Sequence, residues 1–336
     1  MRARVRFAGR MVDFVDRRDA VRWLEDIAGR GTHVVYAIYG PEGCGKTALL
    51  KQAAATLEEY GYAVVHVNPL AEVVDEKLSV SEELREFTGD LGVVLLGDAS
   101  KLVEKAVELL YIAVRRGFRR RIALLADDVL QAVGLDRAEL LVKSLLNLIE
   151  HPSIEYERIA VLVASSEGVT RERVGRHRWA WVHTIWNMPR EGFEELYELI
   201  PSPKPPLEDA WRLSGGNPKA LEELYRARWE ARRVVDMLIA GRSLAELVDS
   251  LKRVDRELLQ AAVEDPDALR GEDAAQLRRA LVERNLIAVL PPSREPHLWV
   301  DTPPPERDLE LGIGRFYAWQ TPLHREAVRN VLERIS

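Results

Sequence analysis

"IYGPEGCGKTALL", residues 38–50, decides the fold that we expect, because an apolar run leads directly into a glycine-rich turn. Gly40, Gly45, Lys46 and Thr47 occupy the fixed positions of G-x-x-x-x-G-K-[ST], the pattern of a phosphate-binding loop. Glycines leave room for successive backbone N–H groups to surround phosphate oxygens, and the following helix adds its positive N-terminal end. The pattern indicates a nucleotide site when a strand precedes it, a helix follows it and a metal-binding carboxylate comes later.

The segments around this motif alternate between strand-like and helix-like patterns. "THVVYAIYG" is a β-rich apolar run ending at the first glycine, and "KTALLKQAAATLEEYG" repeats apolar residues at helical spacing. "YAVVHVNP", "RIALLADDVL" and "RIAVLVASSEG" are predicted as further strands, with helices near 99–116 and 137–150 between them. Such alternation predicts a parallel sheet with helices on both faces. We therefore expect an α/β fold with a parallel-sheet P-loop NTPase core.

Helical patterns dominate after about residue 186. Predicted helices span 206–213, 217–229, 230–240, 243–252, 255–264 and 272–284, after a Pro-rich hinge, "PSPKPP". "NLIAVL", "HLWVD" and "RFYAW" are predicted as short strands, the first two joined by "PPSREP". Helices followed by a β-hairpin indicate a winged helix. We expect an ATPase core over residues 1–203, a helical lid over 204–241 and a winged-helix domain over 242–336.

The composition is that of a globular protein, with 336 residues of which 47% are hydrophobic and 30% charged. No apolar stretch approaches the roughly 20 residues of a membrane span, and the N-terminus lacks the apolar run of a signal peptide. We expect a cytoplasmic protein with no membrane partner. The single cysteine, Cys44, excludes an internal disulfide and a multi-cysteine zinc site.

Four residues carry the chemistry that a bound nucleoside triphosphate requires. Lys46 is expected to reach the β- and γ-phosphates, and the Thr47 hydroxyl to bind Mg²⁺. "IALLADD" ends on two aspartates, of which Asp127 is the expected carboxylate at the metal and Asp128 the residue that orients or deprotonates the attacking water. A strand ending in an acidic turn without a ligand is the alternative. The residues expected to contact the nucleotide phosphates are Pro41, Glu42, Gly43, Cys44, Gly45, Lys46, Thr47 and Ala48.

Two further candidates follow the last predicted strand of the core. Ser165 is expected to hydrogen-bond the γ-phosphate or the attacking water, although serines at strand ends are equally common without such a role. "RERVGRHR", residues 171–178, places four arginines in eight positions. One of them would neutralise charge in the transition state, as an arginine finger does. A solvated loop is the alternative.

Together these segments resemble the archaeal ATPase family of STAND-class P-loop NTPases, relatives of the NB-ARC and AAA+ ATPases. "FVDRRDAVRWLEDI" is similar to the family's opening F-x-x-R-x-x-E-L segment, which implies that Phe14, Val15 and Arg17 lie near the adenine. "VGRHR" resembles the family's Gly-Arg segment, which implies a role for Arg176 at the γ-phosphate. "SGGNPKAL" resembles the G-x-P motif, which implies that Pro218 contacts the nucleotide. The resemblance also implies a switch in which ADP holds a closed form and exchange for ATP opens it.

Two functions remain open. The first is an ATP-dependent molecular switch with slow hydrolysis, and the second is a DNA-loading or DNA-remodelling ATPase whose winged helix binds DNA. Residues 242–336 contain 14 Lys and Arg against 17 Asp and Glu, whereas a DNA-docking module is normally basic. Arg278, Arg279 and Arg284 on the expected recognition helix are the basic exception. We favour the switch, with ATP or ADP and Mg²⁺ as cofactors and a protein partner or self-association; nothing in the sequence suggests the acceptor site of a small-molecule kinase.

Overall fold

A computed structural model of the chain describes residues 2–15, 17–71, 74–88, 99–115, 121–151, 156–166, 168, 174–175 and 178–335. The chain divides into two units. The first comprises Met1–Val5, Arg18–Tyr39 and Lys46–His183, and the second comprises Arg6–Arg17, Gly40–Gly45 and Thr184–Ser336. The glycine-rich loop therefore belongs to the second unit, whereas the helix that follows it belongs to the first. None of the helices in the described ranges has the length and apolar character of a membrane span.

The first unit contains a mainly parallel six-stranded sheet in the order β5-β4-β6-β7-β3-β8. The four strands predicted from the sequence are its parallel centre: β3 (Val35–Tyr39), β4 (Ala63–Val67), β6 (Arg121–Asp127) and β7 (Arg158–Ser165). Two edge strands were not predicted: β5 (Leu78–Val80), which is antiparallel to β4, and β8 (Ala180–Thr184). β5 is only three residues long, and β8 is partly exposed, so neither has the continuous apolar pattern of a central strand.

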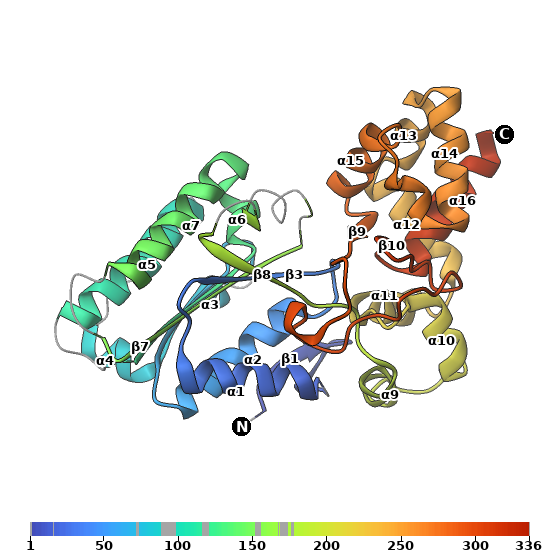
Figure 1. Cartoon of the computed structure of the whole chain (residues 1–336). Helices are drawn as coiled ribbons and strands as arrows, with labels where there is room; N and C mark the ends of the chain where they lie inside the picture. Colours follow the sequence, from blue (N-terminus) through green and yellow to red (C-terminus); the bar gives the residue numbers. More distant parts are fainter. Residues whose placement is uncertain are drawn as a thin grey trace. The chain divides into compact units, whose positions relative to one another are not determined.

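Helices cover both faces of this sheet, as predicted. α1 (Arg18–Arg30) and α2 (Lys46–Glu59) lie on one face, and α5 (Ala99–Arg115) and α7 (Leu135–Glu150) lie on the other (Figure 1). Three short helices, α3 (Val74–Lys77), α4 (Glu82–Thr88) and α6 (Val129–Val133), connect the strands. Val65, Leu124 and Val161 from neighbouring strands are at most 1% exposed and form the centre of the core. Burial on both faces is why these strands are apolar throughout.

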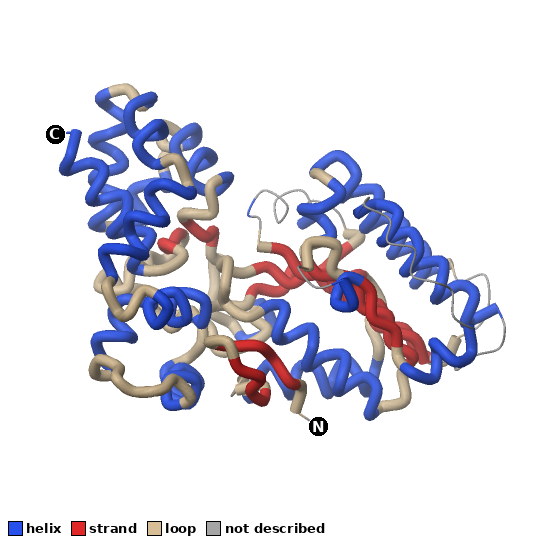
Figure 2. The backbone as a smooth tube through the Cα atoms, turned by 180° about the vertical axis from the view of Figure 1, so that it is seen from behind, coloured by secondary structure: helices blue, strands red, loops and turns tan. Residues whose placement is uncertain are grey.

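The second unit is mostly helical (Figure 2). Its helices begin with α9 (Arg190–Glu198). The six predicted helices are confirmed as α10 (Leu207–Ser214), α11 (Pro218–Arg226), α12 (Ala231–Gly241), α13 (Leu244–Ser250), α14 (Arg253–Glu264) and α15 (Ala275–Glu283). The final helix, α16 (Pro322–Ile335), was not predicted, although Pro322 at its first position is a helix-start signal. A two-stranded sheet of β1 (Arg4–Phe7) and β2 (Arg10–Asp13) was also missed.

The predicted hairpin between "NLIAVL" and "HLWVD" is wrong. β9 (Ile287–Val289) pairs antiparallel with β10 (Tyr317–Trp319), and residues 296–298 form the 3-10 turn η2 (Pro296–Leu298) instead of a strand. Prolines in "PPSREP" lack the N–H that a strand ladder needs. Asp267, in the 3-10 turn η1 (Pro266–Arg270), accepts hydrogen bonds from the backbone N–H groups of Arg315 (2.7 Å) and Phe316 (2.8 Å). These bonds fix the turn that leads β10 back to β9.

Candidate active site

Two polar side chains meet at the carboxyl edge of the first unit's sheet. Asp127, the last residue of β6, is fully buried, and the Nδ2 atom of Asn68 donates a hydrogen bond to its Oδ2 atom at 3.1 Å. Asn68 directly follows β4, which is the parallel neighbour of β6, so the two side chains leave the sheet at the same edge. Asn68 thus orients Asp127. The sequence analysis missed it, although a polar residue directly after a central strand is a usable signal.

Burial dominates the electrostatics of Asp127. Burial, followed by the neighbouring Asp128 charge, raises the pKa of the carboxyl to about 6, although the Thr47 hydroxyl and the Lys46 and Lys51 charges act in the opposite direction. Within the described part of the chain, the Oδ1 atom is shielded from solvent and has no hydrogen-bond partner. A buried carboxylate with an unused oxygen, hydrogen-bonded to a threonine hydroxyl, fits a magnesium ion, whose ligands are oxygens. The metal set predicted from the sequence, Thr47 and Asp127, therefore comes together in the first unit.

Asp128 has an unusual backbone conformation. Its φ of 49° and ψ of 17° lie in the left-handed region, just before α6 begins. Its N–H donates a hydrogen bond to the Ala164 carbonyl on β7 at 3.2 Å. Such a backbone costs a non-glycine residue about 1 kcal/mol, although aspartate tolerates it better than most residues. The strained turn fixes Asp128 at the end of β6, next to the strand that carries Ser165.

The remaining candidates of the first unit occupy the same sheet edge or the start of α2. Ser165 is buried at the end of β7 and pairs in register with Tyr39, the last residue of β3 before the glycine-rich loop. Lys46, Thr47 and Ala48 form the first turn of α2, and the N-terminal end of a helix attracts anions. Lys46 is buried, so an anion beside its ammonium group would be shielded from bulk water.

The glycine-rich loop, residues 40–45 of the second unit, contains two glycines with positive φ. Gly43 (φ 76°) and Gly45 (φ 102°) both adopt backbone conformations that favour glycine. A Cβ atom on Gly43 would also come within 2.2 Å of the Lys219 Cβ atom. The Lys219 N–H donates to the Gly43 carbonyl at 3.3 Å, so the loop and the start of α11 are in direct backbone contact.

The backbone C=O and N–H groups of Glu42 are both hydrogen-bonded to buried amide side chains. Asn217 donates from Nδ2 to the Glu42 carbonyl at 2.9 Å, and the Gln320 Oε1 atom accepts the Glu42 N–H at 2.8 Å. The Glu42 carboxylate forms an ion pair with Arg242. Asn217 and Gln320 are each 1% exposed, so water competes little for these bonds. Residues far apart in sequence therefore fix the conformation of the phosphate-binding loop.

Arg17 is a third attachment point for the loop. Its guanidinium donates to the carbonyl of Cys44, to the carbonyl of Trp186 at 3.3 Å and to the Asp301 carboxylate at 2.8 Å. The side chains of Arg17 and Asp301 are 3% and 2% exposed. The resemblance implies that Arg17 lies near the adenine. The structure shows that it supports the loop from Cys44, and its contact with a nucleotide stays a prediction.

The remaining residues that were predicted to contact the nucleotide lie at several places in the structure. Pro218 is the first residue of α11, directly after Asn217, which caps that helix by accepting the Ala220 N–H at 3.0 Å. Phe14 and Val15 are buried, and Val15 packs in a core cluster with Phe193. Arg176 lies outside the described residues. Sequence patterns gave no indication of Gln320 or Asp301, because both act on a loop more than 250 residues away.

His324, near the start of α16, predicts how stability depends on pH. Burial, followed by the Arg242 charge, lowers the pKa of His324 to about 4, while Glu42 acts in the opposite direction. Its Nδ1 atom lies 2.8 Å from the Thr321 hydroxyl oxygen. Between pH 6.5 and pH 4, this histidine is mostly protonated in the unfolded chain, where its pKa is near 6.5, and mostly neutral in the folded chain. Stability contributed by neutral His324 is therefore fully present above pH 6.5 and declines as the pH falls towards 4.

We expect this histidine alone to lower the free energy of unfolding by about 2 kcal/mol between pH 7.5 and pH 5. Urea unfolding at both pH values, with His324→Gln as the comparison, measures it. The variant should lose about 2 kcal/mol less than the wild type over that interval. His66 in the first unit, whose pKa burial also lowers to about 4, contributes equally in both proteins and cancels. Identical pH dependence in the two proteins would contradict the expectation.

Comparison with solved structures finds matches at low sequence identity and low TM-score. A mutant of Thermotoga maritima RuvB is 16% identical, covers 86% of this chain and 94% of its own, and has a TM-score of 0.38. AMPPCP-bound DnaA from Aquifex aeolicus is 17% identical over 77% of this chain and 80% of its own, with a TM-score of 0.37. Aeropyrum pernix ORC1 in complex with DNA is 17% identical over 95% and 92%, with a TM-score of 0.38. No curated protein sequence matches the chain.

The family model described as an ATPase domain predominantly from Archaea matches residues 14–224. The match includes the glycine-rich loop, Asp127, Asp128, Ser165 and Pro218, and it spans more than half of the chain. The protein therefore belongs to this archaeal ATPase family.

Proposed function

We propose that this protein is a magnesium-dependent ATPase of the STAND type, in which the bound nucleotide sets the conformation of the C-terminal region. The observation that carries the proposal is the attachment of the phosphate-binding loop. Buried side chains of Asn217, Gln320 and Arg17 hold the carbonyl or N–H groups of residues 42–44. If the loop changes conformation when the γ-phosphate binds or leaves, the hydrogen bonds of all three side chains would change with it. Such coupling is reciprocal. If the bound nucleotide changes the equilibrium between two arrangements of these side chains by some factor, then fixing one arrangement changes the nucleotide affinity by the same factor.

Each candidate residue then has a role. Loop N–H groups and Lys46 bind the phosphates, Thr47 and Asp127 hold Mg²⁺, and Ser165 hydrogen-bonds the γ-phosphate or the attacking water. Mg²⁺ bound there would neutralise charge that develops on the phosphates during hydrolysis. Asp128 orients or deprotonates the water. Arg176 as the γ-phosphate contact and Phe14, Val15 and Pro218 as nucleotide contacts remain proposals from the family resemblance.

The domain division is part of this proposal. Residues 1–203 would be the ATPase core, 204–241 the lid that brings Pro218 to the nucleotide, and 242–336 the winged helix that gates it. ADP would hold the closed form and exchange for ATP would open it. Hydrolysis would be slow, because the switch needs long-lived nucleotide states. The nucleotide that co-purifies with the protein bears on this directly, since tightly bound ADP supports the closed state.

Asp128→Asn separates binding from turnover. Asparagine keeps the size of the side chain but removes its basicity, so we expect ATP affinity within about threefold of the wild type and a turnover at least 100-fold lower. Calorimetry gives the affinity and phosphate release gives the turnover. Asp13→Asn, on the exposed β2 strand, serves as a control that should change neither. Unchanged phosphate release in Asp128→Asn would remove this residue from the catalytic role.

The DNA-acting alternative receives less support from the residues that would carry it. Arg278 on α15 donates to the carbonyls of Leu269 and Gly271, and Arg279 forms an ion pair with Glu283 at 2.8 Å. Arg284 donates to a carbonyl of its own helix. Arg278 and Arg284 therefore stabilise local structure, and phosphate contacts would have to compete with their existing bonds to carbonyls. The Arg279–Glu283 pair is exposed and contributes little. This favours the switch over the DNA-loading function.

A further inference from the structure

A pocket in the second unit is a candidate binding site outside the nucleotide machinery. Three helices surround it: α10, α12 and α16. Its volume of about 550 Å³ is within the range of small-molecule sites. The lining residues are Arg212, Leu213, Ala231, Arg232, Val235, Pro322, Leu323, Arg325, Glu326 and Asn330. The volume is sufficient for a small molecule, and the lining combines apolar with charged side chains.

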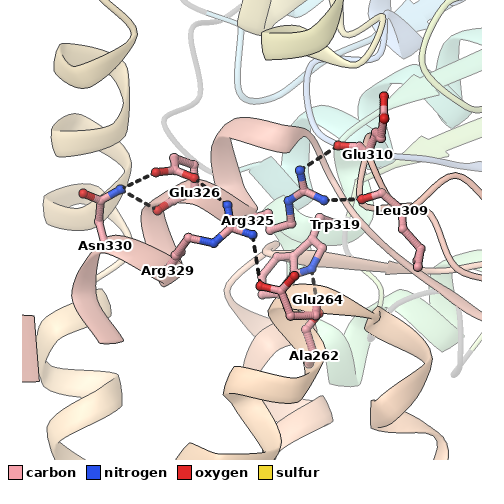
Figure 3. Close-up of polar contacts among 9 residues, drawn as sticks. All are labelled: Ala262, Glu264, Leu309, Glu310, Trp319, Arg325, Glu326, Arg329 and Asn330. Carbon is pink, nitrogen blue, oxygen red and sulfur yellow. Dashed lines mark hydrogen bonds and ion pairs between the residues drawn. The ribbon is translucent and has the colours of Figure 1, made fainter. Parts of the chain in front are cut away.

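Positive charge prevails in this lining. The lining contains three arginines, Arg212, Arg232 and Arg325, and one carboxylate, that of Glu326. Figure 3 shows that Glu326 is already engaged, because Arg329 lies 2.9 Å from its Oε2 atom. Arg325 donates to the carbonyls of Leu309 and Glu310, which accept hydrogen bonds but do not neutralise its charge (Figure 3). In a chain of net charge −6, a lining with excess arginine favours an anionic ligand.

Arg212 and Arg232 are available to bind such an anion. Their nearest carboxylates, Glu208 and Asp236, lie at 3.7 and 4.0 Å, and their side chains are 66% and 88% exposed. Exposed ion pairs of this kind contribute little free energy, so exchanging them for a ligand costs little. Arginine also presents a planar fork that matches carboxylate and phosphate oxygens.

The floor of the pocket is apolar. Leu213 and Ala231 are partly exposed there, whereas Val235 and Leu323, which are at most 4% exposed, are almost completely covered by other atoms of the protein. From this combination we propose that the pocket binds a small amphipathic anion, a carboxylate or phosphate ester whose charged group meets Arg212 and Arg232 and whose apolar body packs on Leu213 and Ala231.

The ligand would act on the phosphate-binding loop through the start of α16; this consequence rests on the proposed function. Pro322 lines the pocket two residues after Gln320, whose side chain accepts the Glu42 N–H. A Cβ atom on Gly215, which ends α10, would lie 2.7 Å from the Pro322 Cδ atom, so the two pocket walls pack tightly there. Filling the pocket would shift Pro322 and, with it, the bond from Gln320 to the loop. The site would thus be an effector site of the switch.

The test measures binding of three probes to the full chain by ligand-observed NMR and calorimetry. The probes are 3-phenylpropionate, phenyl phosphate and the neutral 3-phenylpropanol, each with and without Mg-ADP, which keeps phenyl phosphate out of the phosphate-binding loop. We expect at least one anionic probe to bind with a Kd at least tenfold lower than that of the alcohol. Arg212→Ala with Arg232→Ala should raise that Kd at least tenfold. Arg253→Ala with Arg279→Ala, two exposed helix arginines outside the pocket, is the matched control and should leave it unchanged.

Tighter binding of 3-phenylpropionate identifies a carboxylate ligand, and tighter binding of phenyl phosphate identifies a phosphate ester. Either result supports the proposed anion site. Absence of anion binding, or equal binding to the Arg212–Arg232 double variant and the wild type, overturns it. The second readout is the release rate of a fluorescent ADP analogue, which we expect the bound probe to change at least threefold. Binding without any change in release keeps the pocket and overturns its link to the switch. Failure of the protein to bind ADP refutes the proposed function but leaves the nucleotide-free binding result standing.

Discussion

Asp301→Ala is expected to lower the free energy of unfolding of the second unit by about 3–5 kcal/mol, because it leaves the Arg17 guanidinium buried without its counter-ion. The pair is 2.8 Å apart and almost completely shielded from water. Two backbone carbonyls, of Cys44 and Trp186, still accept from Arg17 but supply no negative charge. The loop should therefore lose rigidity, and we expect weaker ADP binding along with the loss of stability.

Urea unfolding followed by fluorescence measures the effect. Glu257→Ala is the matched control in the same unit, since Glu257 pairs with Arg253 at 2.8 Å but both side chains are exposed. Its expected cost is below about 1 kcal/mol. A double variant, Arg17→Met with Asp301→Leu, removes both charges and should recover much of the lost stability without restoring the bond to Cys44. Equal stability of Asp301→Ala and Glu257→Ala would contradict the role assigned to the buried pair.

Lys46→Ala is expected to reduce ATP affinity about 100-fold, corresponding to about 3 kcal/mol for a charged hydrogen bond in a shielded site. Lys46 is buried at the start of α2, so in the variant water would be a poor substitute for its ammonium group as a partner of the phosphates. The loss should be greater for ATP than for ADP, because the γ-phosphate is one of its expected contacts. Stability should change little in the absence of nucleotide, since removing a buried cation relieves its desolvation cost.

Isothermal calorimetry with ATP and ADP in the presence of Mg²⁺ provides the measurement. Lys105→Ala serves as the control; Lys105 lies on α5 and pairs with Glu108 on the surface. That variant should bind both nucleotides as the wild type does. Unaltered ATP affinity in Lys46→Ala would remove the glycine-rich loop from nucleotide binding altogether.

The sequence was most informative where local patterns and burial agree. The central strands β3, β4, β6 and β7 are apolar because both faces of the sheet are covered, and that makes them visible in a window of a few residues. The carboxyl edge follows from the parallel order, so Asp127 and Ser165 were found as strand-end residues. Edge strands, with one exposed side, lack that pattern, and β5 and β8 were missed for this reason.

Long-range partners are the part that no local pattern predicts. Gln320 follows a short strand and resembles any other polar residue, yet it accepts a bond from a peptide 278 residues away. The pairing of β9 with β10 instead of the nearer "HLWVD" segment depends on Asp267, which belongs to neither strand. Asn68 lies between these two cases. Its position directly after β4 can be seen in the nearby sequence, whereas its partner Asp127 is 59 residues away.

The discontinuity of the second unit has a consequence for the order in which the nascent protein acquires its properties. Gly40–Gly45 leaves the ribosome early, but the partners that shape it, Asn217, Asp301 and Gln320, are translated much later. The sheet of the first unit has all its strands by residue 184 and can form while the rest is still being made. During synthesis the loop thus remains without its full set of buried hydrogen bonds until the segment around residue 320 emerges. A partly made chain would carry the nucleotide motif in its sequence yet lack the contacts that shape the loop in the complete protein.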